Sequence, residues 1–81
     1  MGHYGTIVLD IEKAAYRLGF TSWILTVFCA DGSTHEFIAN DFDLRYDLKR
    51  SSGLRTFYFR RGLFGRRILM AAAPFNPINT D

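Results

Sequence analysis

The sequence has few of the residues that mark the more specialised classes of small protein. Its 81 residues include one cysteine, so no internal disulfide can form and a disulfide-rich secreted scaffold is excluded. No apolar run approaches the ~20 residues of a membrane-spanning helix, and the N-terminus lacks the basic-then-apolar layout of a signal peptide. We therefore expect a cytoplasmic protein in a reducing compartment, with no membrane partner and with Cys29 as a small core residue.

Motifs for catalysis, metal binding and nucleotide binding are also lacking. With one cysteine and two histidines, a four-ligand zinc site of recognisable spacing cannot be assembled. His35 and Glu36 are adjacent on an expected strand, so their side chains would point to opposite faces. The pair Asp41 and Asp43 is more typical of a turn and helix cap than of a metal site, and residues 62–65 match no phosphate-binding glycine loop. We expect no catalytic residue, no metal and no cofactor, and thus a protein that is not an enzyme.

The composition that is present belongs to an ordinary folded domain. The chain is 48% apolar and 22% charged, within the range of globular proteins, and its length allows one domain. We expect residues 1–73 to form this domain and residues 74–81, which contain both prolines, to form a tail. A chain this short buries only about 60% of its unfolded surface, so its stability should be marginal unless it docks on a partner or on another copy.

The N-terminal third of the chain can be interpreted in two ways. Residues 6–18 place apolar side chains at helical intervals, which predicts an amphipathic helix. These apolar positions are Ile7, Ile11, Ala14, Ala15 and Leu18. The β-branched and apolar run 7–9 alternatively favours a strand over residues 4–10.

Residues 23–30 and 33–39 predict a first hairpin. The first segment is rich in β-branched and aromatic residues, and Asp31-Gly32 between the segments is typical of a two-residue type I′ turn. Such a turn would pair Cys29 with Thr34, Val27 with Glu36, and Leu25 with Ile38. Both faces of this hairpin would then carry apolar side chains. The hairpin is therefore expected to be central in the fold, or to pack one face on a helix and the other on a partner.

The C-terminal half predicts a short helix and a second hairpin. Residues 40–43 carry capping side chains, and a helix over 44–50 would place Leu44 and Leu48 on one face. Residues 54–60 and 66–73 form the second hairpin around residues 61–65. The expected fold is a small α+β domain with an antiparallel sheet of about four strands, packed with one or two helices in the order α-β-β-α-β-β.

Charge is divided unevenly along the chain. Residues 1–44 hold two basic and six acidic residues, whereas residues 45–67 hold eight basic residues and one acidic residue. Most of these cations are arginines, which bind phosphate or carboxylate in a bidentate manner and stack on aromatic rings. Aromatic residues are interleaved with them, a combination that favours a surface for nucleic acid. The expected binding residues are Arg45, Lys49, Arg50, Arg55, Tyr58, Arg60, Arg61, Phe64, Arg66 and Arg67.

Three functions are compatible with this basic segment. The leading hypothesis is a non-enzymatic binding module whose C-terminal hairpin engages a polyanion, most simply nucleic acid. The second is a small inhibitor or interaction protein, of the kind that mobile genetic elements encode, which docks on an acidic or nucleic-acid-handling protein. Self-association through a sheet edge fits either hypothesis. A purely structural alternative is that the arginines keep the domain soluble, protect a sheet edge and pair with the acidic first half.

The third functional hypothesis comes from a resemblance. The segment Gly53–Arg60, followed by Arg67–Met70, resembles the paired C-terminal strands of small basic bacterial endoribonucleases, the RelE-like toxins. The resemblance implies an α+β domain that presents basic and aromatic side chains on a sheet toward RNA. It covers a minor part of the chain, includes no diagnostic motif, and lacks the paired N-terminal helices that such toxins usually carry.

Overall fold

The computed structural model describes residues 3–75 as five strands, one α-helix and a short 3₁₀ turn. In chain order these are β1 (His3–Leu18), β2 (Trp23–Cys29), β3 (Thr34–Ile38), α1 (Phe42–Lys49), β4 (Gly53–Arg61), η1 (Leu63–Gly65) and β5 (Arg67–Pro74). A small α+β domain is confirmed. The order is β-β-β-α-β-β, so the predicted first helix is wrong and a fifth strand takes its place.

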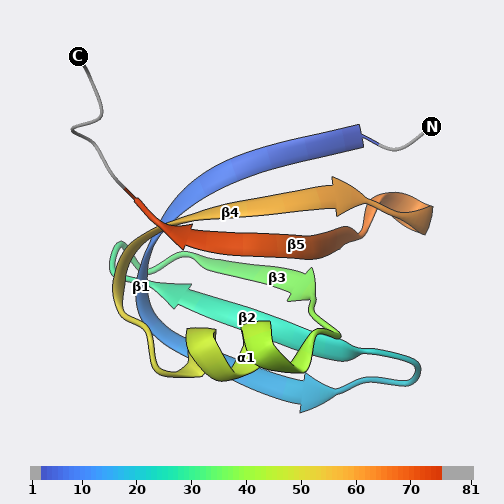
Figure 1. Cartoon of the computed structure of the whole chain (residues 1–81), viewed down its shortest axis with the longest axis horizontal. Coiled ribbons are helices and arrows are strands. Elements are labelled where there is room, and N and C mark those ends of the chain that lie inside the picture. Colours follow the sequence, from blue (N-terminus) through green and yellow to red (C-terminus); the bar gives the residue numbers. More distant parts are fainter. Residues whose placement is uncertain (1–2, 76–81) are drawn as a thin grey trace.

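The strands form a barrel in the order β1-β2-β3-β5-β4. The long strand β1 curls around one side, so that its first half lies beside β4 and its second half beside β2 (Figure 1). β3 and β5 meet in parallel at the single pair Ile38 and Ile68. The sheet is therefore mixed, and the expectation of an entirely antiparallel sheet is wrong. The barrel is closed, and its number of strands is that of the five-stranded Greek-key barrel called the OB-fold.

A bulge in β1 explains why this strand has the apolar spacing of a helix. Its register with β2 shifts between Ile11 and Lys13. Before the shift the odd-numbered residues, such as Leu9, face the core, whereas after it the even-numbered residues Ala14 and Tyr16 pack against the core. Two alternating runs that are out of phase produce intervals of three residues, which resemble helical spacing. The helix over 6–18 is therefore wrong, and the alternative of a strand over 4–10 is confirmed.

The β2–β3 hairpin differs from its predicted register by one residue. Phe28, rather than Cys29, is the partner of Thr34, so all three predicted pairs are wrong. The Gly32 N–H donates to the Cys29 carbonyl at 2.9 Å, and Gly32 has φ +90°. Gly32 is thus the left-handed bulge residue that follows a type I turn, not the second central residue of a type I′ turn. The shift turns Phe37 toward the core, where it is 2% exposed.

Helix α1 covers one end of the barrel. The Asp41 carboxylate accepts a hydrogen bond from the Leu44 N–H at 3.2 Å and caps the first turn, while Lys49 in the last turn suits the negative end of the helix dipole. Leu48 is fully buried and Leu44 packs against the core, as predicted. The predicted helix is confirmed, although it begins at Phe42 rather than at residue 44.

The core is an aromatic stack surrounded by aliphatic side chains. The Phe37 and Phe57 rings are parallel within 9°, with centroids 5.3 Å apart. Leu25 and Val27 from β2 are fully buried beside them, and each such side chain contributes about 1.5–3 kcal/mol. Cys29 is buried as well, in agreement with its predicted place in the core.

The second hairpin is confirmed as β4 and β5; β4 is one residue longer at each end than expected, and β5 begins and ends one residue later. Pro74 ends β5 rather than beginning a tail, and residues 76–81 of the predicted tail lie outside the described residues. Within residues 3–75 no helix is long and apolar enough to cross a membrane.

Tyr16 is the polar exception in the barrel interior. Its hydroxyl is buried and has no hydrogen-bond partner among the described residues. Burial raises the pKa of Tyr16 to about 12, against the opposing effect of the nearby Arg45 charge. A buried hydroxyl without a partner costs about 1–3 kcal/mol.

We expect Tyr16→Phe to raise the free energy of unfolding at pH 7 by about 1 kcal/mol, because it removes this hydroxyl without opening a cavity. Urea denaturation measures the change. Because the fold favours the neutral phenol, wild type should also lose stability relative to Tyr16→Phe as the pH rises from 10 toward 12. A Phe variant that is less stable than wild type at pH 7 would contradict this account.

Candidate nucleic-acid interface

Two loops lie at the same end of the barrel, which we call the loop end (Figure 1). They are the β1–β2 loop, residues 19–22, and the β4–β5 loop, residues 62–66. A hollow of about 200 Å³ lies between them, lined by the β1–β2 loop, by Arg17 and Ile24, and by Arg66 from the other loop. Residues far apart in the sequence therefore share one surface here.

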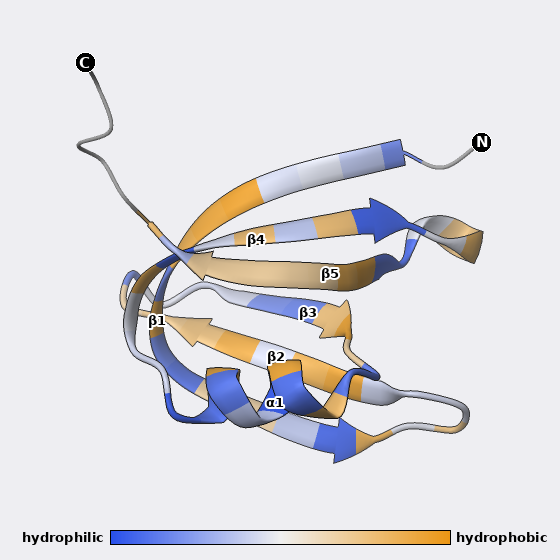
Figure 2. Ribbon diagram, viewed as in Figure 1, coloured by the Kyte–Doolittle hydropathy of each residue, from blue (hydrophilic) through white to orange (hydrophobic). Residues whose placement is uncertain are grey.

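Four arginines gather around the β4–β5 loop. These are Arg60, Arg61, Arg66 and Arg67, which we call the arginine cluster. Figure 2 shows them as the hydrophilic segments where β4 ends and β5 begins. Arg61 and Arg67 are partners across the two strands, while Arg60 is the partner of Tyr4 on β1 and Arg66 is exposed on the loop.

Arg61 and Arg67 rest on the aromatic core. The Arg67 guanidinium carbon lies 4.3 Å from the centroid of the Phe37 ring and 5.7 Å from that of Phe59. The Arg61 guanidinium carbon lies 5.5 Å from the centroid of the same Phe59 ring. Each such cation–π contact is worth about 0.5–2 kcal/mol, depending on exposure. The stack of core rings thus ends in two guanidinium groups at the loop end.

The electrostatics of this pair favour an anion. Burial lowers the pKa of Arg67, and the neighbouring charge of Arg61 lowers it further, whereas Glu36 acts in the opposite direction. Arg67 remains charged at neutral pH because the guanidinium pKa is intrinsically very high. Two cations held over one ring repel each other, and a phosphate between them would relieve that repulsion.

The β4–β5 loop holds its aromatic residue in solvent. The Gly62 N–H donates to the Arg66 carbonyl at 2.7 Å, and an Arg61 guanidinium N–H donates to the Gly65 carbonyl at 3.1 Å. Phe64 has φ +61° and is 91% exposed. Positive φ is strained for a bulky side chain, and strain of this kind concentrates at functional positions.

The β1–β2 loop adds a second exposed aromatic residue that sequence reasoning missed. Phe20 is fully exposed and lines the hollow at the loop end together with Arg17. Neither residue was among the expected binding residues. Arg17 lay in the expected helix over residues 6–18, and Phe20 lay in the connection that follows it. The sequence did contain one signal for Phe20 as a surface residue, because it is an aromatic residue within the short polar segment 19–22.

None of the described acidic residues forms an ion pair with the arginine cluster, although Glu36 is close enough to Arg67 to favour its charged form. Within residues 3–75 the one ion pair joins Arg17 to Glu36 at 3.7 Å, with both side chains about 60% exposed. Such an exposed pair contributes little stability. Arg61 and Arg67 are instead held by aromatic faces, and Arg61 also by a backbone carbonyl, and these groups neutralise no charge.

The other basic residues predicted to bind lie elsewhere. Arg45 donates two hydrogen bonds, at 3.1 Å to the Ala39 carbonyl and at 2.8 Å to the Asn40 carbonyl, and its guanidinium lies 4.8 Å from the Trp23 ring centroid. Arg45 therefore connects α1 to the end of β3, and its guanidinium is committed to the protein's own groups.

Three further cations lie at the end of the barrel opposite the loop end, where α1 finishes and β4 begins (Figure 1). Lys49 is exposed, Arg50 donates to the Tyr46 hydroxyl at 2.7 Å, and Arg55 makes a long 3.4 Å contact with the Ala72 carbonyl. The structure thus divides the basic segment between two ends of the barrel. Tyr58 lies between them on the outer face of β4.

The loop end combines guanidinium groups with exposed aromatic rings. No group of three His, Cys, Asp or Glu side chains in residues 3–75 is arranged to hold a metal ion. Comparison of the chain with protein-family models, curated proteins and solved structures finds no match. The chemistry of the loop end therefore has to carry any functional assignment.

The strain at Phe64 can be measured with two substitutions. Asn adopts positive φ readily, whereas Leu keeps the strain of a bulky side chain. We expect Phe64→Asn to be about 1 kcal/mol more stable than Phe64→Leu in thermal or urea denaturation. Equal stability of the two variants would show that the loop relaxes and stores no strain at this position.

Proposed function

We propose that this protein is a small non-enzymatic module that binds single-stranded nucleic acid at the loop end of its barrel. One observation carries the proposal. Four arginines that pair with no carboxylate of residues 3–75 surround a loop whose aromatic side chain projects into solvent. A second exposed phenylalanine projects from the loop beside it.

The chemistry of these groups matches an unpaired strand. Guanidinium groups bind phosphate oxygens in a bidentate manner, and unpaired bases stack on aromatic side chains with about 1–3 kcal/mol per base. A duplex hides the faces of its bases, so Phe20 and Phe64 would contribute little to duplex binding. Because every base has an aromatic face, such a site tolerates many sequences.

The topology adds support at the level of analogy. OB-fold barrels bind oligonucleotides and oligosaccharides through the face of their second and third strands and through the β1–β2 and β4–β5 loops. In this chain the same two loops carry Phe20, Phe64 and Arg66. Fold alone does not assign function, so the proposal depends on the arginine cluster and not on the barrel.

A second candidate function is docking on another protein, as an inhibitor or interaction module. The outer face of β1, β4 and β5 exposes several large apolar side chains. These are Tyr4, Val8, Leu54, Tyr58 and Met70. Tyrosine and methionine are enriched in protein interfaces, and an exposed apolar patch often marks one.

The nucleic-acid proposal is tested with two variants of equal charge change. Arg60→Glu with Arg66→Glu alters the loop end, and Lys49→Glu with Arg50→Glu alters the opposite end. We expect the first pair to weaken binding of a labelled oligothymidylate at least tenfold at low salt and to flatten the salt slope by about 1.4, since two phosphate contacts are lost. The second pair should leave both values nearly unchanged. Fluorescence anisotropy over a salt series measures them.

Two results would overturn the proposal. One is wild-type protein that binds no single-stranded DNA or RNA at low salt. The other is an equal loss of affinity in both charge variants, which would mean that binding follows net charge rather than the loop end. Circular dichroism checks that each variant is folded.

The same reactions distinguish binding from cleavage. His3 is the partner of Arg61 across β1 and β4, so an imidazole lies near the cluster, as the endoribonuclease alternative would require. We expect RNA recovered on a denaturing gel to be intact, and shortened RNA would favour that alternative.

A further inference from the structure

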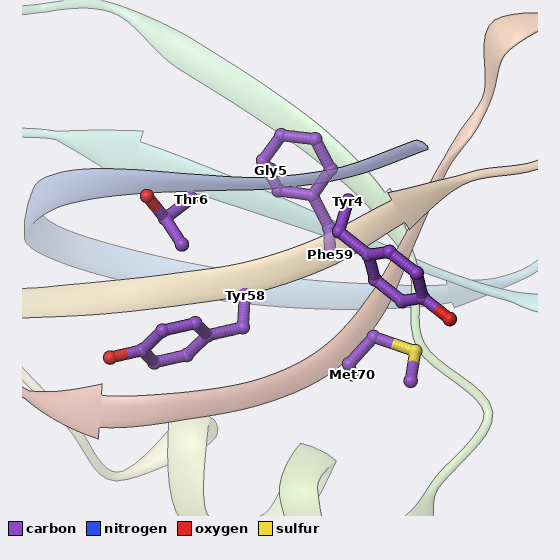
Figure 3. A pocket seen from close by; sticks show the side chains of 6 residues that line it. All are labelled: Tyr4, Gly5, Thr6, Tyr58, Phe59 and Met70. Atoms are coloured by element: carbon purple, nitrogen blue, oxygen red, sulfur yellow. The ribbon is translucent and has the colours of Figure 1, made fainter. Parts of the chain in front are cut away.

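A second hollow, of about 330 Å³, opens on the outer face of β1, β4 and β5. Tyr4, Gly5, Thr6, Tyr58, Phe59 and Met70 line it. In Figure 3 the Tyr4 ring and Met70 lie toward one side of the hollow and Tyr58 and Thr6 toward the other. Its volume is at the lower end of the range for small-ligand sites.

Two features of the strands shape this hollow. Its floor is the paired backbone of β1 and β4. Gly5 faces inward there, where a Cβ atom placed on it would lie 2.8 Å from the tip of the Phe59 ring, so the Phe59 ring packs directly against the inner side of the β1 backbone. Met70 is the extra residue of a bulge, because Phe59 pairs with Leu69 and Tyr58 pairs with Ala71. The bulge turns Met70 outward, where it is 51% exposed.

The rim of the hollow holds aromatic surface that the fold does not need. Tyr4 is 76% exposed, and Tyr58, which is exposed as well, lies on the other side of the hollow, with the two hydroxyl groups pointing apart (Figure 3). Their rings offer stacking surfaces, while their hydroxyl groups and that of Thr6 can bond to polar edges. None of the six lining residues is charged, so the hollow suits a flat, neutral, partly polar ring.

A positive charge lies directly beside this hollow. Arg60 is the partner of Tyr4 across the two strands and lies two residues from Tyr58, so alternation places all three side chains on the outer face. Arg60 also belongs to the arginine cluster. An anionic chain that leaves the cluster along this face therefore meets Arg60 first and the hollow next.

From this placement we infer that the hollow is a stacking site for one unpaired base of the nucleic-acid strand whose phosphates bind the arginine cluster. The inference rests on the proposed function and extends the strand's path from the loop end onto the outer face of β4. A base is the one flat neutral ring that arrives attached to phosphates, which is why Arg60 beside the hollow favours it over an apolar side chain of a protein partner.

The test compares Tyr58→Leu with Tyr46→Leu, a matched change at an exposed tyrosine on α1. Both variants and wild type bind a labelled oligothymidylate in a salt series followed by fluorescence anisotropy. We expect Tyr58→Leu to weaken binding about 5- to 100-fold without changing the salt slope, because a stacked base is lost and the phosphate contacts are kept. Tyr46→Leu should bind like wild type.

An abasic strand of the same length provides the second arm, since it keeps the phosphates and lacks the bases. Wild type should bind it more weakly than oligothymidylate, and Tyr58→Leu should weaken that binding no further. Should Tyr58→Leu fail to fold, Tyr4→Leu at the exposed start of β1 replaces it with the same expectations.

Failure of the base site and failure of the proposed function give different results. If Tyr58→Leu binds oligothymidylate like wild type, or loses equally on both strands, the base site is wrong. If the Arg60 and Arg66 variant still loses affinity in that case, the proposed function stands and the outer face is better assigned to protein docking. If wild type binds neither strand, both proposals are wrong.

Discussion

The structure depends on one strand pairing with two neighbours. β1 reaches β4 with its first half and β2 with its second, and the register shift between Ile11 and Lys13 lets the same face of the strand point inward along both halves. Closure of the barrel follows from this bulge. Tyr4 and Gly5 consequently lie beside β4, while Arg17 reaches the loop end. The β1 residues of both proposed binding surfaces are therefore positioned by this irregularity.

Core and surface are also continuous in this protein. The rings of Phe57 and Phe37 stack inside the barrel, and the Arg67 guanidinium covers the outer ring at the loop end. The same side chain thus completes the packing and presents charge to solvent. This arrangement orders the guanidinium before any ligand arrives, which lowers the entropic cost of binding. Arg60 and Arg66, by contrast, contribute charge without closing the core.

Local signals predicted the elements that depend on few residues. The capping carboxylate at Asp41 and the apolar pair Leu44 and Leu48 predicted α1, and the segments 54–60 and 66–73 on either side of residues 61–65 predicted β4 and β5, without the bulge at Met70. The helix expected over residues 6–18 failed because a bulge converts two alternating runs into helical intervals. The predicted register of the first hairpin was wrong because Gly32 suits a type I′ turn and a bulge after a type I turn equally well. Only the pairing across the whole hairpin selects between these two turns.

The sequence by itself determined how much charge this protein carries, the absence of an internal disulfide and the presence of an arginine-rich hairpin. Tertiary structure decided which of those charged residues lie close together in space. Six residues of extended strand span about 20 Å, so Arg55 and Arg61, both on β4, lie toward opposite ends of the barrel. Strand pairing meanwhile places Arg17 and Phe20 beside Arg66 of the β4–β5 loop, although they are more than 40 residues away in the sequence. In an extended strand, residues that are near in sequence can lie far apart in space. Which residues share a binding surface is therefore decided by the closure of the barrel.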